Sequence, residues 1–305
     1  MVSTRRQSVL ISAVIVLPLV VAVPQSARAT SSAAPAKSTA SPPCDPIASF
    51  SANHFPNRPK INNTWLPLVP GANTVLSGTV EGDDGTLHQH SIVATVTDLT
   101  KTINGVRTLV VFERDFDDGQ LQESELAFEA QDRVGRVWNI GEYPEEYENG
   151  KLTGAPSTWL SGVARATAGV GMLANPQQGT PSYRQGRAPA VDFFDCGMVA
   201  KTHQHVCVRV GCFNEVLVID EWAPLDPEGG HQLKYYAPGV GSIKVAAAGG
   251  VNAEVLTLTS KTTLGAAALA RIRDAVIEQD RRGYRVAKSV YAHTPPVKRL
   301  AACSR

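Results

Sequence analysis

Apolar and polar residues alternate along most of this chain, which is the pattern of half-buried β-strands. Ile92, Ala94 and Val96 occupy alternate positions of one such stretch, and side chains two residues apart point to the same face of a strand. Turn residues separate the stretches, as at Asn104-Gly105, a pair typical of tight hairpins. We therefore predict strands at 73–80, 88–99, 107–116, 120–132, 136–141, 190–200, 205–210, 215–222, 232–237, 242–247 and 254–259.

The alternation is weak between residues 142 and 185. We interpret the acidic segment 143–150 as a turn, and 162–179 is rich in Gly, Ala and Pro. A long excursion with little periodicity often covers a sheet face or lines a cleft. We therefore expect this region to cover a face of the sheet or to line a cleft.

The period changes near the C-terminus, where apolar residues recur at helical spacing. Thr262 or Thr263 is a candidate N-cap and Gly283 a candidate stop, so we predict an amphipathic helix at about 264–282. The predicted fold class is mainly β: an antiparallel meander forms a curved sheet, a partly closed barrel or a sandwich, with this one C-terminal helix. The apolar stripe of the helix consists of Leu264, Leu269, Ile272 and Val276.

The N-terminus has the features of a secretory signal. Arg5 and Arg6 precede an apolar run at 9–23, and Ala27-Arg28-Ala29 fits a cleavage site. We predict a signal peptide at 1–29, a disordered Ser/Ala/Pro linker at 30–43 and a single β-rich domain at 44–305. The mature chain then has no transmembrane span, and we expect it to be secreted and associated with the cell envelope.

Charge and cysteine content fit an exported chain. Removing three arginines with the signal changes the formal net charge from +1 to −2, which argues against nucleic acid as a partner. Five cysteines predict disulfides in that compartment, with one thiol left over. Cys196 with Cys207 across a hairpin at 201–202, Cys207 with Cys212, and Cys44 with Cys303 are the alternatives.

Two His-Gln-His tripeptides are candidates for metal binding. Residues two apart on a strand point to the same side, so each tripeptide offers two imidazoles to Cu or Zn. No carboxylate has the spacing to support these histidines as an outer partner, and a polar residue near a turn needs no such role. The four candidate ligands are His88, His90, His203 and His205.

The segment 229–241 joins a turn, an aromatic strand and a stop at Pro238. His231, Tyr235 and Tyr236 are its candidate ligand-binding residues, for sugar stacking or proton abstraction. On a strand, Tyr235 shares one face with Leu233 and His231, whereas Tyr236 lies on the other. No nucleophile elbow, His-Glu-x-x-His motif or phosphate loop occurs in the chain, so neither catalytic residues nor a cofactor are assigned.

Six motifs occur in a fixed order along the chain: Val93-Ala-Thr-Val-Thr-Asp-Leu-Thr-Lys-Thr-Ile-Asn-Gly-Val-Arg-Thr, Asp118-Gly-Gln-Leu-Gln-Glu, Ala130-Gln-Asp, Val137-Trp-Asn-Ile-Gly-Glu-Tyr, Glu148-Asn-Gly-Lys and Lys234-Tyr-Tyr-Ala-Pro-Gly-Val-Gly. This set of motifs resembles a widespread bacterial family of exported β-rich proteins that have no assigned activity. The resemblance covers roughly residues 63–259 and implies an antiparallel, curved β architecture in the cell envelope, without catalytic residues. The segment from Cys207 to Cys212 and the C-terminal helix look like features of a narrower branch.

Three functional hypotheses follow. The leading one is a secreted binding or scaffold protein that holds a small molecule, a glycan or an envelope protein against a concave sheet. The second is a metalloprotein, including a metalloenzyme, that uses the four histidines of the tripeptides. The third is a carbohydrate-active enzyme with His231 and Tyr235 or Tyr236 in its site.

Overall fold

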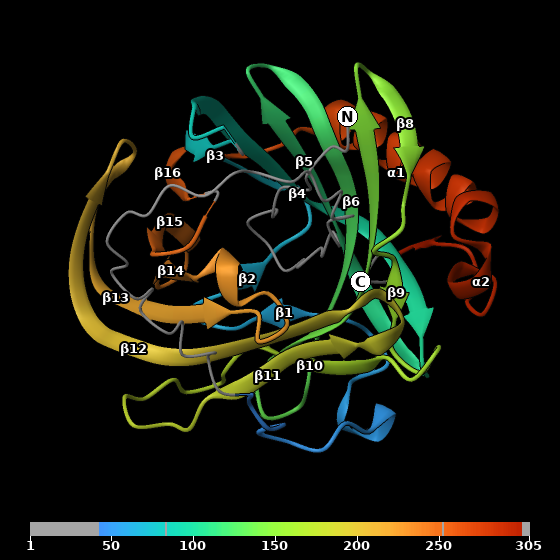
Figure 1. Cartoon of the computed structure of the whole chain (residues 1–305). Helices are drawn as coiled ribbons and strands as arrows, with labels where there is room; N and C mark the ends of the chain where they lie inside the picture. The colour runs from blue at the N-terminus through green and yellow to red at the C-terminus, as the bar shows by residue number, and fades with distance from the viewer. Residues whose placement is uncertain (1–42, 83, 252, 301–305) are drawn as a thin grey trace, which may run out of the picture.

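The computed structural model describes residues 43–82, 84–251 and 253–300. Within them, twelve antiparallel strands form a closed barrel, and the long helix α1 (Ala266–Val286) lies along its outer surface (Figure 1). The mainly β fold with one C-terminal helix is therefore confirmed, and the barrel is fully closed. Its strands are β3 (Ala72–Glu81), β4 (Leu87–Ile103), β5 (Val106–Asp117), β6 (Gln120–Gln131), β7 (Val137–Glu148), β10 (Thr167–Met172), β11 (Tyr183–Ala188), β12 (Phe193–Val208), β13 (Gly211–Trp222), β14 (His231–Ala237), β15 (Gly241–Ala248) and β16 (Glu254–Thr263).

Each barrel strand pairs with the next barrel strand along the chain, β7 with β10 included, and the pairing of β16 with β3 closes the ring. Short elements decorate the barrel. They are η1 (Ala52–His54), β1 (Ile61–Asn62), β2 (Pro67–Leu68), β8 (Lys151–Gly154), β9 (Trp159–Leu160), η2 (Pro189–Val191), η3 (Pro227–Gly229), α2 (Lys288–Tyr291) and β17 (Lys298–Arg299).

Tight turns set the register of the first hairpins. Asn104 and Gly105 have φ angles of 47° and 78° and join β4 to β5 with Ile103 opposite Val106. Positive φ at both central residues matches the right-handed twist of the strands. Asp118 and Gly119 make the equivalent turn between β5 and β6. The local sequence therefore fixes these strand pairs.

The region 142–185 differs from the prediction. The acidic segment 143–150 is not a turn: β7 runs through it to Glu148, and the chain reverses at Asn149-Gly150. Acidic side chains are compatible with a strand here because Glu145 accepts hydrogen bonds from Tyr143 and Arg282. The rest of the region supplies β10 and β11, which complete the barrel.

The hairpin expected at 201–202 is also absent. β12 is one continuous strand that turns only after Val208, so Cys207 lies opposite Cys212 and bonds to it. Cys196 instead bonds to Cys44 and ties the start of the described chain to the barrel. Cys303 lies outside the described residues. The pairings of Cys196 with Cys207 and of Cys44 with Cys303 are therefore wrong.

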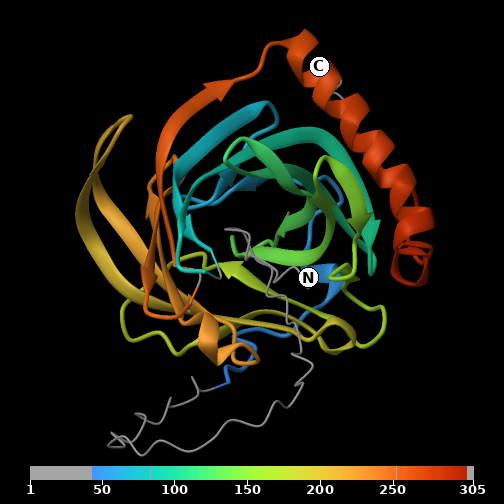
Figure 2. The ribbon, with the colours of Figure 1, turned by 45° about the horizontal axis from the view of Figure 1, so that its top comes forward.

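Helix α1 covers the outer face of the barrel beside β4 to β7 (Figure 2). Its residue Val276 is fully buried, and Tyr291 of α2 packs between Tyr143 and Phe128 of the barrel. Helix α1 begins after Gly265 and continues through Gly283, later than the prediction at both ends. Gly283 does not stop the helix; a side chain there would come within 2.6 Å of the Tyr291 ring.

Candidate ligand-binding cavity

A cavity of about 340 Å³ lies in the barrel, at the end where β3 begins and β16 ends. Alternate residues of the surrounding strands form its wall, as the pleat requires. Val111 and Glu113 of β5 line it, as do Ala127 and Glu129 of β6. Phe128, between the last two, points outward to Tyr291. The alternation along each strand therefore separates a cavity face from a helix-covered face.

The entrance of the cavity is apolar. The segment 66–70 lies across it, and the turn between β14 and β15 borders it at Val240. These two segments are joined, because Gly239 donates its backbone N–H to the carbonyl of Thr64. Lys261 also lines the entrance and directs its ammonium group to the carbonyls of Gly239 and Val240. The apolar side chains that line the cavity include Leu66, Leu68, Val69, Leu76 and Val96.

Acidic side chains line the interior part of the cavity wall, and two of them have partners in the chain. Glu142 accepts hydrogen bonds from the side chains of Asn139 and Trp159. Glu221 accepts one from Gln185 at 2.9 Å and pairs with the ammonium of Lys234 at 2.5 Å. The positions of these two carboxylates are therefore fixed by the barrel itself.

Glu129 differs from its neighbours because its Oε2 has no hydrogen-bond partner, although the residue is only 7% exposed. Burial raises the pKa of Glu129 to about 8. Burial, and then the charges of Asp115 and Glu129, raise the pKa of Glu113 well above its usual value. An unpartnered carboxyl group in a cavity is costly to bury and is a common sign of a binding site.

Lys234 is a buried cation of the barrel interior, and its ammonium pairs with Glu221. Burial works against its charged form, but Glu221, Asp195 and Glu254 outweigh that effect and raise its pKa. Asp195 carries an unpartnered Oδ1, and burial raises its pKa to about 7. The ammonium of Lys234 therefore interacts electrostatically with several buried carboxyl groups.

His90 is held deeper in the barrel, between two carboxylates. Its Nδ1 lies 2.7 Å from Asp117 and its Nε2 lies 2.8 Å from Glu254. Burial alone lowers the pKa of His90, but the hydrogen bonds to both carboxylates raise it to about 10. A metal ligand needs a neutral imidazole nitrogen. His90 has none to offer, because each of its nitrogens faces a carboxylate.

The other three predicted metal ligands lie near or on the surface. His88 bonds to Asp118 at 2.7 Å, and His203 and His205 bond to Glu215 and Asn214 on the β12–β13 hairpin. Five strands separate β12 from β4 in the sheet order. Among the described residues, one His/Cys/Asp/Glu group places three ligand atoms within 4.8 Å, namely His205, Cys207 and Cys212.

That group holds only one of the four histidines, and its two cysteines are bonded to each other. A disulfide sulfur is not the thiolate that binds metals. The geometry therefore gives no support to a shared site of His88, His90, His203 and His205, which stays a prediction.

The strand alternation divides the second predicted set. Tyr236 is 3% exposed and lines the cavity. Tyr235 lies on the other face, with the ammonium of Lys244 5.1 Å from its ring centre. His231 stacks on Trp222 and bonds to Asp220 at 2.8 Å. Of these three residues, the structure places Tyr236 in the cavity wall.

The acidic interior of the barrel was missed at the sequence level, although a signal existed. Acidic residues occupy alternate positions at the end of β5 and odd-numbered positions of β6, which places them on one face of each strand. In a closed barrel this face is the interior. The residues are Glu113, Asp115 and Asp117 on β5, and Glu123, Glu125 and Glu129 on β6.

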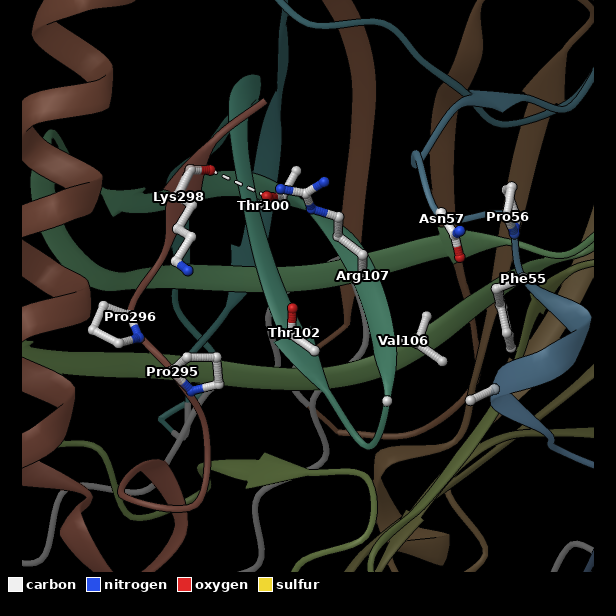
Figure 3. Close-up of a pocket in the computed structure, with 12 residues that line it drawn as sticks. Phe55, Pro56, Asn57, Thr100, Thr102, Val106, Arg107, Pro295, Pro296 and Lys298 are labelled. Carbon is white, nitrogen blue, oxygen red and sulfur yellow. Dashed lines mark hydrogen bonds between the residues drawn. The ribbon is translucent and has the colours of Figure 1, made fainter. Parts of the chain in front are cut away.

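A second pocket, also of about 340 Å³, lies on the outside of the barrel between η1, the β4–β5 hairpin and the C-terminal segment (Figure 3). Arg107, Pro295 and Lys298 are among its lining residues, and Thr100 donates a hydrogen bond to the carbonyl of Lys298. No buried unpartnered group lines it among the residues described. It therefore provides an internal control for the barrel cavity.

Comparison with known proteins leaves the family open. No family model and no curated protein matches the chain. A protein described as exported, with a YmcC-like fold, from Bacteroides fragilis is 12% identical with a TM-score of 0.33, and it covers 66% of this chain and 100% of its own. A protein described as a lipoprotein from Parabacteroides distasonis is 13% identical with a TM-score of 0.33, and it covers 65% of this chain and 99% of its own. At these TM-scores neither likeness carries an argument about fold or function.

Two predictions concern segments at the limits of the described chain. The signal peptide and almost all of the linker lie outside the described residues. In the part of the chain that the structure covers, no helix has the length and apolar character to cross a membrane.

Proposed function

We propose that this chain is an exported binding protein that holds a small organic molecule inside its barrel. The single observation that supports this function is the cavity, which combines an apolar entrance with a carboxyl group that has an unpartnered oxygen. Binding sites for small molecules are typically concave and mostly apolar, with a few polar groups that fix orientation. The sequence supports export through its N-terminal signal features.

The test is whether an uncharged apolar probe binds in the barrel. N-phenyl-1-naphthylamine fluoresces strongly in apolar surroundings, so titration with the mature chain reports its binding. Thr74 of β3 lines the barrel cavity, and Thr74→Phe places an aromatic ring in that space. We expect this variant to lose most of the probe signal.

Thr102→Phe is the matched control, because Thr102 is also a strand threonine and lines the outer pocket of equal volume. It should bind the probe as the unaltered chain does. The melting temperature of each variant is measured as well, and it should equal that of the unaltered chain, which excludes misfolding. Failure of the unaltered chain to bind the probe, or equal loss in both variants, would refute the proposed function.

A further inference from the structure

We propose that the natural ligand of the barrel cavity is an amphiphilic cation: an apolar body with one amine-type head group that pairs with Glu129 and Glu113. This inference deepens the proposed function and rests on it. The apolar body would lie against the apolar lining residues, among them Leu66 and Leu76. The head group would reach the two acids on β5 and β6.

The charge of the cavity wall carries the argument. Every titratable side chain on the interior part of the wall is an acid or the phenol of Tyr236, and the one lining lysine sits at the entrance with two carbonyls. Glu142 and Glu221 already have donors from the chain. An anionic ligand would find no cation on this part of the wall, whereas a cation would supply a partner for the carboxyl group of Glu129.

The unpartnered oxygen of Glu129 is explained by a bound ligand and not by a structural role in the barrel. Buried polar atoms are nearly always hydrogen-bonded, and an exception in a cavity indicates a partner that is absent. Glu129 Oε2 is such an exception, on a residue that is 7% exposed and lines the cavity. An ammonium group offers three donors and full compensating charge.

A metal ion fits this place less well than an organic cation. Ca²⁺ and Mg²⁺ need several oxygen ligands gathered around one point. Within the described residues, the acids of the barrel form no group of three whose ligand atoms lie within 4.8 Å of one another. The apolar entrance would also have no role for a bare ion. A volume of 340 Å³ equals about eleven water molecules at the density of the liquid, enough for a medium-length chain.

Three probes of one length and different head groups test the inference: octylammonium, octanol and sodium octanoate. Each compound is tested for displacement of N-phenyl-1-naphthylamine from the mature chain. Its affinity is then measured by calorimetry at about pH 8.5, where a primary amine still carries its charge. We expect octylammonium to bind about tenfold or more tighter than octanol, and octanoate to bind weakest.

Variants then locate the head group. Glu129→Gln should weaken octylammonium by about tenfold and leave octanol unchanged. Glu113→Gln is the second variant, in case the first folds poorly, with the same expectation. Glu228→Gln, at an exposed glutamate of η3, is the matched control and should change neither affinity.

Proton release gives an independent readout. Below about pH 8 the Glu129 carboxyl group holds a proton in the empty cavity. Pairing with a cation favours the carboxylate, so binding at pH 6.5 should release protons to the buffer, and Glu129→Gln should release fewer. Calorimetry in buffers of different ionisation enthalpy measures this release.

The outcomes separate the two proposals. If the probe and octanol bind inside the barrel but octylammonium has no advantage, or if Glu129→Gln and Glu113→Gln leave that advantage intact, the cationic head group is refuted and the binding function stands. If none of the four compounds binds, the binding function fails together with this inference.

Discussion

Buried charges occur in two regions of this molecule, and the regions treat them differently. Under helix α1, each buried carboxylate has a cation: Asp280 has Lys101 at 2.8 Å, and Glu145 has the guanidinium of Arg282 at 2.7 Å. Inside the barrel, Glu125 and Glu129 each keep an oxygen without a partner. Acids inside the barrel such as Glu221 also have a cation, but carboxyl oxygens without a partner are left in that region.

The comparison distinguishes buried charges that have a partner within the chain from buried carboxyl groups that a ligand would have to pair. In a buried ion pair each charge is compensated by the other, so removal of one partner lowers the free energy of unfolding strongly. An unpartnered buried carboxyl group costs stability in the empty protein. Such a cost is typical of functional sites. Three predictions test this distinction.

The largest effect is expected at Lys101, whose ammonium is fully buried and also bonds to Tyr284 and the carbonyl of Pro295. Burial lowers the pKa of Lys101, and only Asp280 opposes this shift. Lys101→Met should cost about 3–5 kcal/mol of unfolding free energy, because Asp280 is left as an uncompensated charge. Urea unfolding at pH 7 measures it.

The double variant Lys101→Met with Asp280→Leu removes both charges and should recover much of that loss. Glu113→Gln inside the barrel should cost far less than Lys101→Met, since it removes no paired charge. A loss below about 1 kcal/mol for Lys101→Met would contradict the distinction between the two regions.

The second effect concerns the pH dependence of stability. Glu129 ionises near pH 4.5 in the unfolded chain and near 8 in the folded one. Between these values the folded state holds a proton that the unfolded state has lost, so stability falls as pH rises through the window and levels off above it. Each such group contributes a slope of about 1.4 kcal/mol per pH unit.

Glu129→Gln should therefore flatten the fall in stability between pH 5 and 8 by about that slope, as measured by urea unfolding at four pH values. Other buried acids keep part of the slope, because burial also raises the pKa of Asp195 to about 7. Glu228→Gln, on the surface, should leave the profile unchanged. An unchanged profile for Glu129→Gln would show that this carboxyl group is not buried in its neutral form.

The smallest effect is expected at the exposed edge of the helix interface. Arg273 binds Asp98 through two bonds of 2.8 Å, whereas Arg299 adds a third at 3.2 Å and is 69% exposed. Arg299→Ala should change the unfolding free energy by less than about 1 kcal/mol, because solvent screens such pairs. Arg273→Ala should cost more. Thermal melts of the two variants check the order.

Local sequence was sufficient for much of the fold. Hairpins such as the one at Asn104-Gly105 follow from turn chemistry and alternation, which act over a few residues. The segment 142–185 was misjudged because β10 pairs with β7 across the intervening elements β8 and β9 rather than across a single turn, and β11 then lies between β10 and β12. Local sequence also gave no sign of the disulfide between Cys44 and Cys196, because these residues are 152 positions apart in the chain.

The candidate site divides in the same way. The pattern of residues 231–236 correctly placed Tyr235 and Tyr236 on opposite faces of a strand, but it did not indicate which face was the interior. The His-Gln-His pairs were equally visible, yet His90 is enclosed by carboxylates while His203 and His205 stay on the surface. Alternation along a strand shows which side chains share a face, but it does not show what that face contacts in the folded protein.

The order of strands and turns, and the sharing of faces within each strand, were thus set by neighbours along the chain, because backbone geometry and turn propensity are local. Closure of the barrel placed one face of β6 around a cavity, so Glu129 became an unpartnered acid, whereas Glu145 on β7 came to lie under α1 and paired with Arg282. That difference arises from contacts between distant segments, and it is these contacts that fix burial, charge balance and the site.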